Sequence, residues 1–247
     1  MMGFAKRVEE ASLNAWPASR QMVFDGWLLR FADGYTRRAN SVNPIYAGSE
    51  NTEHKIKFCE KVYRDRQLPC VFKITPFVQP TNLDEILAEA GYKQEALTSV
   101  QTLDLDSGIF ESFPDRLEWT NPVEAWVKDY VRMNGVGANH IASLRSILTH
   151  IVPETDYMLL WEQHSTVACG LAVRDGDWVG LFDIVTDTSQ RGKGFGQKLI
   201  SSLLAWGIQR GARSAYLQVM LNNEAALKLY AKLGFREIYR YWYRVKG

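Results

Sequence analysis

The sequence predicts an α/β (α+β) protein made of two similar halves, each built from strands and helices. Three observations predict this class. Short apolar segments alternate with segments in which apolar residues recur at helical spacing. The strand and helix patterns of the first half return in the same order in the second half. A glycine-rich turn at residues 190–196 lies between a strand pattern and a helix pattern.

The second half has the clearer pattern, and Pro122 suits the first turn of its first helix. Asp175-Gly176 is a hairpin signal between two strands, and Asn222 or Asn223 can cap the last helix. The expected elements are a short strand at 118–120, helices at 122–134 and 139–151, strands at 157–162, 166–174 and 178–185, a helix from about 196, a strand at 214–220, a helix to 233 and an extended segment at 235–245.

The first half repeats this organisation. Residues 27–44 resemble residues 170–187 around a shared Asp-Gly pair, and residues 70–105 resemble residues 214–245. Chance similarity between αβ units is the alternative, but two segment matches in the same order favour a duplication. The junction is expected within residues 106–116, which contain glycine, proline and serine without clear periodicity. We therefore expect two domains, at residues 1–110 and 117–247.

Composition argues against several classes of protein. The formal net charge of +1 favours neither nucleic acid nor an anionic membrane as a partner. Cys59, Cys70 and Cys169 lack the CxxC spacing of a zinc site or disulfide framework, and they suit a reducing compartment. No apolar run approaches the length of a membrane span, and the charged N-terminal stretch lacks the apolar core of a signal peptide. We expect a cytoplasmic monomer or homodimer that holds no metal.

The glycine-rich run at residues 190–196 has the character of an anion site. Its glycines let the backbone approach a ligand closely, Arg191 and Lys193 add positive charge, and a helix N-terminus offers unpaired N–H groups. The spacing fits neither a P-loop, GxxxxGK[ST], nor the dinucleotide fingerprint GxGxxG, but it fits an RxxGxG loop. The first half has Glu50 and Glu53 in the corresponding place, where they would repel a pyrophosphate.

Two motifs resemble those of the GCN5-related N-acetyltransferase (GNAT) family. The acyl-CoA signature of the family is [Q/R]xxGx[G/A] between a strand and a helix, as in Arg191, Gly194 and Gly196. The NxxAxxLY pattern of the family, here from Asn223 to Tyr230, follows downstream in the expected order. The resemblance runs from about residue 117 to the C-terminus, and the repeat extends a weaker likeness to the first half. The chain thus resembles a tandem GNAT protein with a degenerate N-terminal half and an acyl-CoA site in its C-terminal half. The resemblance implies that each half is a mixed sheet flanked by helices.

The resemblance implies acetyl-CoA as co-substrate and a set of binding residues. Backbone N–H groups of the loop would hold the CoA pyrophosphate, and the loop consists of Arg191, Gly192, Lys193, Gly194, Phe195 and Gly196. Ile184, Val185 and Thr186, at the end of a strand that splays from its neighbour in the family, would pair with the pantetheine arm. Asn223 would hydrogen-bond the same arm. The spacer at 186–190 departs from the family because it lacks a proline and is one residue longer than usual.

Acetyl transfer to an amine needs a neutral amine and a protonated leaving thiol. The resemblance implies Tyr230 as the acid, and the alternative is that Tyr230 only packs in the core. Asp183, on the strand beside the thioester position, is the leading candidate for the base; the alternative is a structural acid paired with a neighbouring arginine. Glu162 is a weaker candidate for the base, and His140 and His150 have the pattern of ordinary surface or core residues.

The sequence does not identify the acceptor of the acetyl group. A small amine or an amino-acid-like acceptor, held between the halves, is the leading interpretation. A peptide or protein N-terminus and a non-catalytic acyl-CoA-binding module are the alternatives. Arg37-Arg38 and the alternating Tyr239, Tyr241 and Tyr243 of the last strand either pack or line the acceptor pocket.

Overall fold

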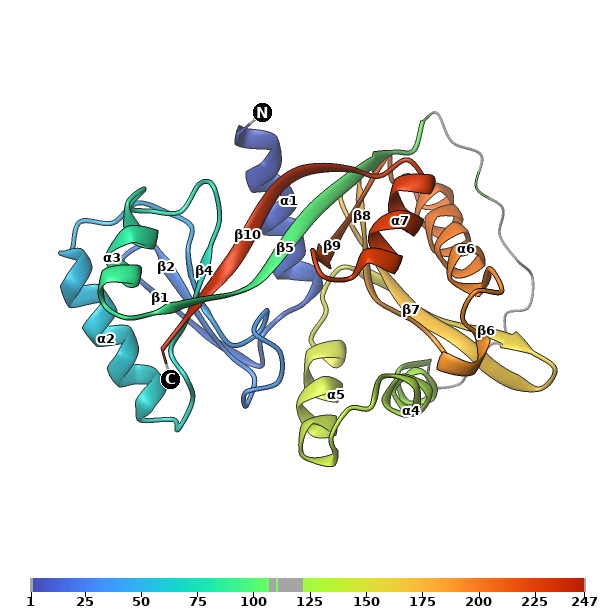
Figure 1. Cartoon of the computed structure of the whole chain (residues 1–247), viewed down its shortest axis with the longest axis horizontal. Coiled ribbons are helices and arrows are strands. Elements are labelled where there is room, and N and C mark those ends of the chain that lie inside the picture. Colours follow the sequence, from blue (N-terminus) through green and yellow to red (C-terminus); the bar gives the residue numbers. More distant parts are fainter. Residues whose placement is uncertain (1, 107–109, 111–121, 247) are drawn as a thin grey trace.

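The computed structural model of the chain describes residues 2–106, 110 and 122–246 (Figure 1). The helices are α1 (Met2–Ala15), α2 (Thr52–Arg64), α3 (Leu83–Glu89), α4 (Pro122–Asn134), α5 (Ile141–Thr149), α6 (Phe195–Gln209) and α7 (Glu224–Lys232), with 3-10 turns η1 (Ala138–His140) and η2 (Thr188–Gln190). The strands are β1 (Arg20–Phe24), β2 (Trp27–Phe31), β3 (Val42–Pro44), β4 (Val71–Ile74), β5 (Lys93–Asp104), β6 (Glu154–Glu162), β7 (Ser165–Asp175), β8 (Trp178–Thr186), β9 (Ser214–Met220) and β10 (Arg236–Val245). A mixed sheet flanked by helices confirms the predicted class.

One sheet of ten strands runs through both halves, in the order β1-β2-β3-β4-β10-β5-β9-β8-β7-β6. Two neighbouring pairs, β3 with β4 and β8 with β9, are parallel, and the other described pairs are antiparallel. Each strand of the first half has a counterpart in the second, from β1 with β6 to β5 with β10. With this matching, the sheet has the same strand order when it is read from its β1 edge and from its β6 edge. Helices α2 and α3 take the places in the first half that α6 and α7 take in the second. This symmetry agrees with the repeat predicted from the sequence.

The last strand of each half is inserted beside the other half. Strand β10 lies between β4 and β5, and β5 lies between β10 and β9. The two strands pair in antiparallel fashion from Arg236↔Thr102 to Val245↔Lys93. Figure 1 shows them as long ribbons that cross from one half of the molecule to the other. The junction predicted at 106–116 lies mostly outside the described residues, so the division into domains 1–110 and 117–247 stays a prediction.

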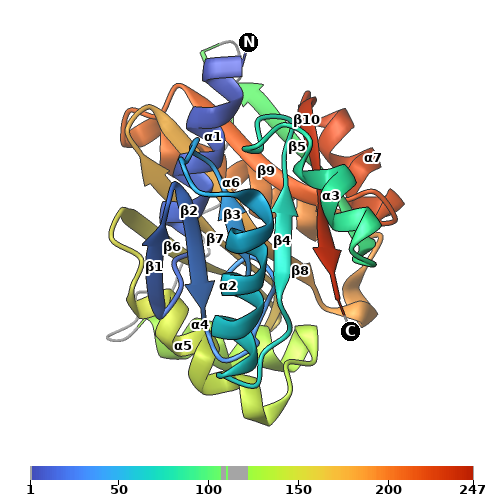
Figure 2. The same ribbon diagram turned by 90° about the vertical axis from the view of Figure 1, so that its left-hand side faces the viewer.

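Three clusters of buried apolar side chains hold the layers together. One packs α2 and α3 on the first half of the sheet, which Figure 2 shows from that side. The second packs α6 and α7 on the second half. The third joins α1, α4 and α5 to strands of both halves. Neighbouring residues Val179 and Trp178 of β8 belong to the second and third clusters respectively, which therefore lie on opposite faces of the sheet.

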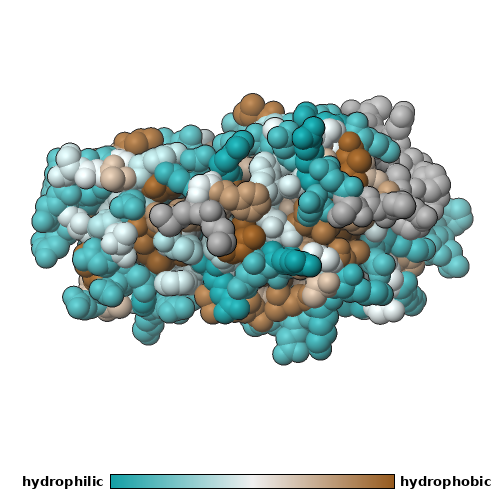
Figure 3. Space-filling view, turned by 90° about the horizontal axis from the view of Figure 1, so that it is seen from above, coloured by the Kyte–Doolittle hydropathy of each residue, from teal (hydrophilic) through white to brown (hydrophobic). Residues whose placement is uncertain are grey.

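The predicted elements of the second half are present with small shifts. The helix predicted at 139–151 is split into η1 and α5, and the strand predicted from residue 157 begins at Glu154. The strand predicted at 118–120 lies outside the described residues. Viewed from above, the surface mixes hydrophilic and apolar residues (Figure 3). Among the described helices, none combines the length and apolar character needed to cross a bilayer.

Candidate active site

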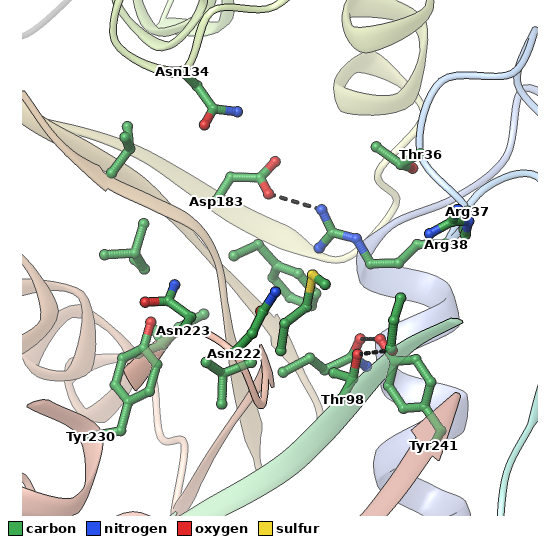
Figure 4. Close-up of a pocket in the computed structure, with 18 of the residues that line it drawn as sticks. Thr36, Arg37, Arg38, Thr98, Asn134, Asp183, Asn222, Asn223, Tyr230 and Tyr241 are labelled. Carbon is green, nitrogen blue, oxygen red and sulfur yellow. Dashed lines mark hydrogen bonds and ion pairs between the residues drawn. The ribbon is translucent and has the colours of Figure 1, made fainter. Parts of the chain in front are cut away.

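A cavity opens where β8 and β9 separate. The two strands pair only from Trp178↔Ser214 to Leu181↔Leu217. Beyond this point, side chains of both strands and of α4, β5, α7 and β10 enclose a cavity of about 510 Å³ (Figure 4). The splaying expected at the end of the strand 178–185 is therefore present. The opening lies beside the two exchanged strands, at the junction of the halves.

A bulge in β8 directs Asp183 to this cavity. The ladder with β7 gains one extra residue in β8 between Phe182 and Val185. Asp183 has φ +48°, a conformation that residues other than glycine rarely adopt and that recurs at functional sites. Asp183 is the one acidic side chain among the described residues that line the cavity.

The wall that faces Asp183 comes from the first half. Residues 32–41 join β2 to β3, whereas the matching connection between β7 and β8 comprises only residues 176–177. Asn40 fixes the longer loop, because its side-chain oxygen accepts from the N–H of Ala32 at 2.8 Å and its amide nitrogen donates to the carbonyl of Tyr35 at 2.8 Å. The loop contributes three residues to the cavity lining, namely Thr36, Arg37 and Arg38.

Arg38 meets Asp183 at the cavity wall. Its Nη2 donates to Asp183 Oδ1 at 2.8 Å, and its guanidinium lies over the ring of Trp16, 4.3 Å from the centroid. The two side chains are 25% and 9% exposed. Pairing with an arginine, the alternative interpretation of Asp183, is therefore present in the structure. The second carboxylate oxygen, Oδ2, is buried and has no hydrogen-bond partner among the described residues.

The glycine-rich loop leads from β8 into α6. Gly192 and Gly194 have φ +78° and +86°, which glycine adopts without strain. A Cβ added at either position would meet no atom within 4 Å, so the space beside both is open. Gly194 is the N-cap of α6 and supplies no capping side chain, which leaves N–H groups of the first helical turn available to an anion. Arg191 and Lys193 are exposed beside them.

The remaining residues predicted for the donor lie close to this loop. Ile184, Val185 and Asn223 line the cavity. A Cβ added at Gly196 would lie 3.4 Å from Thr186 Oγ1, so the end of β8 contacts the first turn of α6. Phe195 is buried in the second apolar cluster and anchors that turn. The loop and the splayed strand end thus form one continuous surface.

The spacer before the loop forms the 3-10 turn η2, and a clamp from α4 holds it. The Asp187 carboxylate accepts from Ser189 N at 3.0 Å and pairs with Arg132 at 2.8 Å. Hydrogen bonds from Ser189 and Arg132 lower the pKa of Asp187. Arg132 also donates to the carbonyl of Thr166 in β7 at 2.9 Å. The longer spacer noted in the sequence is therefore an ordered turn tied to two neighbouring elements.

Tyr230 lies across the cavity from Asp183 (Figure 4). Helix α7 presents it, and Asn223 caps this helix by accepting from Ala226 N at 3.2 Å. The ring packs edge-on against Phe235 with centroids 5.9 Å apart. Burial raises the pKa of Tyr230 to about 12, so the phenol is protonated at neutral pH. Asn223 uses its side-chain oxygen for the cap, and its amide N–H groups donate to no partner among the described residues.

Comparison with known proteins identifies the family. Residues 5–244 match the family described as "Probable histone acetyltransferase Rv0428c C-terminal". The "Uncharacterized N-acetyltransferase YobR" of Bacillus subtilis (strain 168) is 30% identical over 248 residues, which cover 98% of both proteins. A solved structure, "GCN5-related N-acetyltransferase from Kribbella flavida", is similar with a TM-score of 0.74 and 14% identity, over 100% of this chain and 96% of that one. The chain belongs to the GNAT family of N-acetyltransferases.

A tandem arrangement has a precedent among GNAT structures. The solved "Tandem GNAT protein from the clavulanic acid biosynthesis pathway" is similar to 76% of this chain and 67% of its own, with a TM-score of 0.57 and 16% identity. At that identity the likeness concerns the fold alone.

The first half of this GNAT protein fills its own anion site with a carboxylate. Asp25, in the β1–β2 turn, accepts from the backbone N–H groups of Ser49 and Glu50 at 2.9 and 3.0 Å. Lys55 pairs with the same carboxylate at 2.9 Å, and the hydrogen bonds from Ser49 and Lys55 lower the pKa of Asp25. Asn51 caps α2 by accepting from two of its N–H groups. The N–H groups that could bind a phosphate are already occupied, in keeping with the loss of a cofactor site expected for this half.

The other residues considered as bases lie outside the cavity, and some residues that line the cavity were not predicted. Glu162 and His150 are exposed and do not line it; the ring of His140 instead packs against Tyr35, with centroids 5.5 Å apart. Several lining residues carry no sequence signal for a site, and these are Thr98, Tyr130, Asn134 and Gln218. Tyr241 and Tyr243 of the last strand are buried and also line the cavity. They therefore both pack in the core and contribute to the cavity wall.

Arg132→Gln should weaken acetyl-CoA binding several-fold without unfolding the protein. The substitution removes the ion pair with Asp187 that ties η2 to α4. The backbone that leads into the glycine-rich loop is then held less firmly. Isothermal titration with acetyl-CoA measures the effect. Arg145→Gln is the matched control, because Arg145 forms an exposed pair with Glu124 at 3.0 Å, away from the loop. Equal affinities for both variants would contradict the role assigned to Arg132.

Proposed function

We propose that this GNAT protein transfers the acetyl group of acetyl-CoA to the amine of a small-molecule acceptor. One observation carries the proposal: a single cavity is lined by the splayed β8, by α7, by α4 and by the first-half loop at 32–41. Such a cavity offers a donor side next to the glycine-rich loop and an acceptor side at the junction of the halves. The domains at 1–110 and 117–247 would then share one site.

The donor side supports acetyl-CoA through three features of the chain. The open glycine-rich loop suits a pyrophosphate, because its backbone N–H groups and the α6 N-terminus are free of side-chain caps. The unpaired edge of β8 beyond Leu181 can hydrogen-bond an amide-containing arm such as pantetheine. Asn223 keeps amide donors for the same arm. We assign Ile184 to Thr186, Arg191 to Gly196 and Asn223 to donor binding.

Two residues on opposite sides of the cavity can move protons. We assign Asp183 as the base that takes a proton from the acceptor amine, directly or through water, and Tyr230 as the acid that protonates the leaving thiolate. One oxygen of the Asp183 carboxylate pairs with Arg38 at 2.8 Å, and the other has no hydrogen-bond partner among the described residues. Because burial raises the pKa of Tyr230 to about 12, its hydroxyl stays protonated and can donate its proton as the bond from carbon to sulfur breaks.

A protein or peptide amine is the second candidate acceptor. The family that matches residues 5–244 is described as a probable histone acetyltransferase, and that description favours a protein acceptor. The cavity walls that enclose Asp183 favour a small one. We also propose a cytoplasmic location, because all three cysteines are free buried thiols. A monomer or homodimer is the oligomeric state that we propose.

Release of CoA over time tests the proposal. Purified protein is mixed with acetyl-CoA and panels of small amines, amino acids and lysine-containing peptides, and free thiol is measured. Amine-dependent release, with acetylated product seen by mass spectrometry, is expected. Tight acetyl-CoA binding without release across all panels would point to a non-catalytic binding module and overturn the proposal.

Asp183→Asn should lower kcat/KM on the order of 100-fold at neutral pH, because the amide cannot accept the amine proton. The loss should shrink as pH rises, since more of the acceptor is then already neutral. Thermal unfolding of the variant reports the separate effect of losing the Arg38 pair. Glu162→Gln serves as a control, because Glu162 lies outside the cavity and its substitution should change kcat/KM little. Full activity of Asp183→Asn would remove Asp183 as the base.

A further inference from the structure

The acceptor side of the cavity presents a carboxylate and a guanidinium next to each other. Asp183 and Arg38 are joined through one oxygen and one nitrogen at 2.8 Å, and both line the cavity. Asp183 Oδ2 is buried and has no hydrogen-bond partner among the described residues. Among these residues, Asp183 is also the single side chain to which the Arg38 guanidinium donates. Both groups therefore retain hydrogen-bonding capacity beyond their mutual pair.

Arg38 is held in place independently of Asp183. Its guanidinium stacks on Trp16, and its backbone carbonyl accepts from Arg30 Nη1 at 2.9 Å. Arg30 is itself 2% exposed, so the loop backbone is anchored in the interior. A preformed guanidinium with free N–H groups is well suited to a carboxylate, which it can bind through two parallel hydrogen bonds.

We propose that the acceptor is a free α-amino acid, with its amino group at Asp183 and its carboxylate at Arg38. This inference rests on the proposed function and adds the chemical class of the acceptor. An α-amino acid carries an ammonium and a carboxylate on one carbon, which is the complement of the guanidinium–carboxylate pair in the wall. The acceptor carboxylate would draw on Arg38 donors, and its ammonium would lose one proton to Asp183 before attack.

The same pair disfavours the two other classes of acceptor. A simple amine reaches Asp183 as a cation and brings an uncompensated positive charge beside Arg38. A peptide N-terminus has a neutral amide where the amino acid has its carboxylate, so it offers the remaining Arg38 N–H groups no anion besides Asp183. Tyrosine rings line much of the remaining acceptor side, namely Tyr130, Tyr241 and Tyr243. They offer aromatic faces to an apolar or aromatic side chain.

A matched set of acceptors tests the proposal. We would compare kcat/KM for L-phenylalanine, L-phenylalaninamide and phenethylamine with acetyl-CoA, and repeat the comparison with L-leucine, L-leucinamide and isoamylamine. We expect the free amino acid to exceed the other two on the order of 10- to 100-fold, mainly through KM, as a charged hydrogen-bonded pair would give. The amino group of each amino acid amide loses its proton more easily than that of the free amino acid. Intrinsic reactivity would therefore favour the amide, and it cannot explain a preference for the free acid.

Two variants connect the preference to Arg38. Arg38→Gln should remove most of the preference for the free acid, and Arg38→Lys should keep part of it. Arg210→Gln is the matched control, because Arg210 pairs with Glu154 at 2.6 Å and does not line the cavity, so its loss should leave the preference intact. Equal use of acid, amide and amine, or an equal loss on all three in Arg38→Gln, would overturn this inference while acetyl transfer itself still stood. No transfer to any acceptor of this set or of the wider panels would overturn the proposed function as well.

Discussion

Tyr230→Phe is expected to lower kcat on the order of 100-fold and to change acetyl-CoA affinity by less than about twofold. The substitution removes only the hydroxyl that faces the cavity, and the ring can still pack against Phe235. Rapid-quench or steady-state kinetics give kcat, and titration calorimetry gives the affinity. Because burial raises the pKa of Tyr230 to about 12, its ionisation should not lower kcat between about pH 7 and about pH 10.

Tyr216→Phe is the matched control for this experiment. Tyr216 is fully buried, and its hydroxyl has no hydrogen-bond partner among the described residues and does not line the cavity. Losing that hydroxyl should leave kcat close to the wild-type value. If Tyr230→Phe retained normal turnover, the thiolate would have to obtain its proton elsewhere, and Tyr230 would be a packing residue.

Gly194→Asp should weaken acetyl-CoA binding at least about 100-fold. The new carboxylate would lie at the N-terminus of α6, where it competes for the free N–H groups and repels a pyrophosphate. Aspartate tolerates positive φ better than most residues, so the cost to folding should be small. The variant would imitate in the second half what Asp25 does in the first. Titration calorimetry and thermal unfolding measure the two effects separately.

Gly211→Asp controls for backbone strain at the other end of the same helix. Gly211 has φ +86°, the same value as Gly194, but follows the C-terminus of α6. Both variants pay a similar conformational cost, and only Gly194→Asp adds charge at the anion site. Comparable loss of acetyl-CoA binding in both would mean that helix stability, rather than the loop, controls donor affinity.

Local patterns were sufficient to predict most elements of the second half. The Asn223 cap, the hairpin at Asp175-Gly176 and the glycine-rich turn depend on neighbours in the chain, so the sequence displays them directly. The repeat was visible for the same reason. Neighbours in the sheet were not visible, because β5 and β10 have ordinary strand patterns that do not specify partners. Their exchange between the halves is a consequence of long-range pairing.

The acceptor side of the site was the least predictable part. Arg38 and Asp183 are 145 residues apart in the chain, so the ambiguity of Arg37-Arg38 could not be resolved without the fold. The bulge that directs Asp183 to the cavity is one extra residue in a strand whose register depends on β7. Tyr130 and Asn134 reach the cavity from a helix whose sequence shows only amphipathic spacing.

The exchanged strands also restrict how this molecule can move. An enzyme whose site lies between two parts often admits substrate by hinge opening, with a short linker as the pivot. Here the halves share a ladder that runs from Arg236↔Thr102 to Val245↔Lys93, and a hinge motion would have to break its hydrogen bonds. We therefore expect entry of the acceptor to depend on side-chain movements at the rim of the cavity, because Asn40 and Arg30 anchor the loop at residues 32–41. Selection by shape would then occur in a rigid cleft before any chemistry.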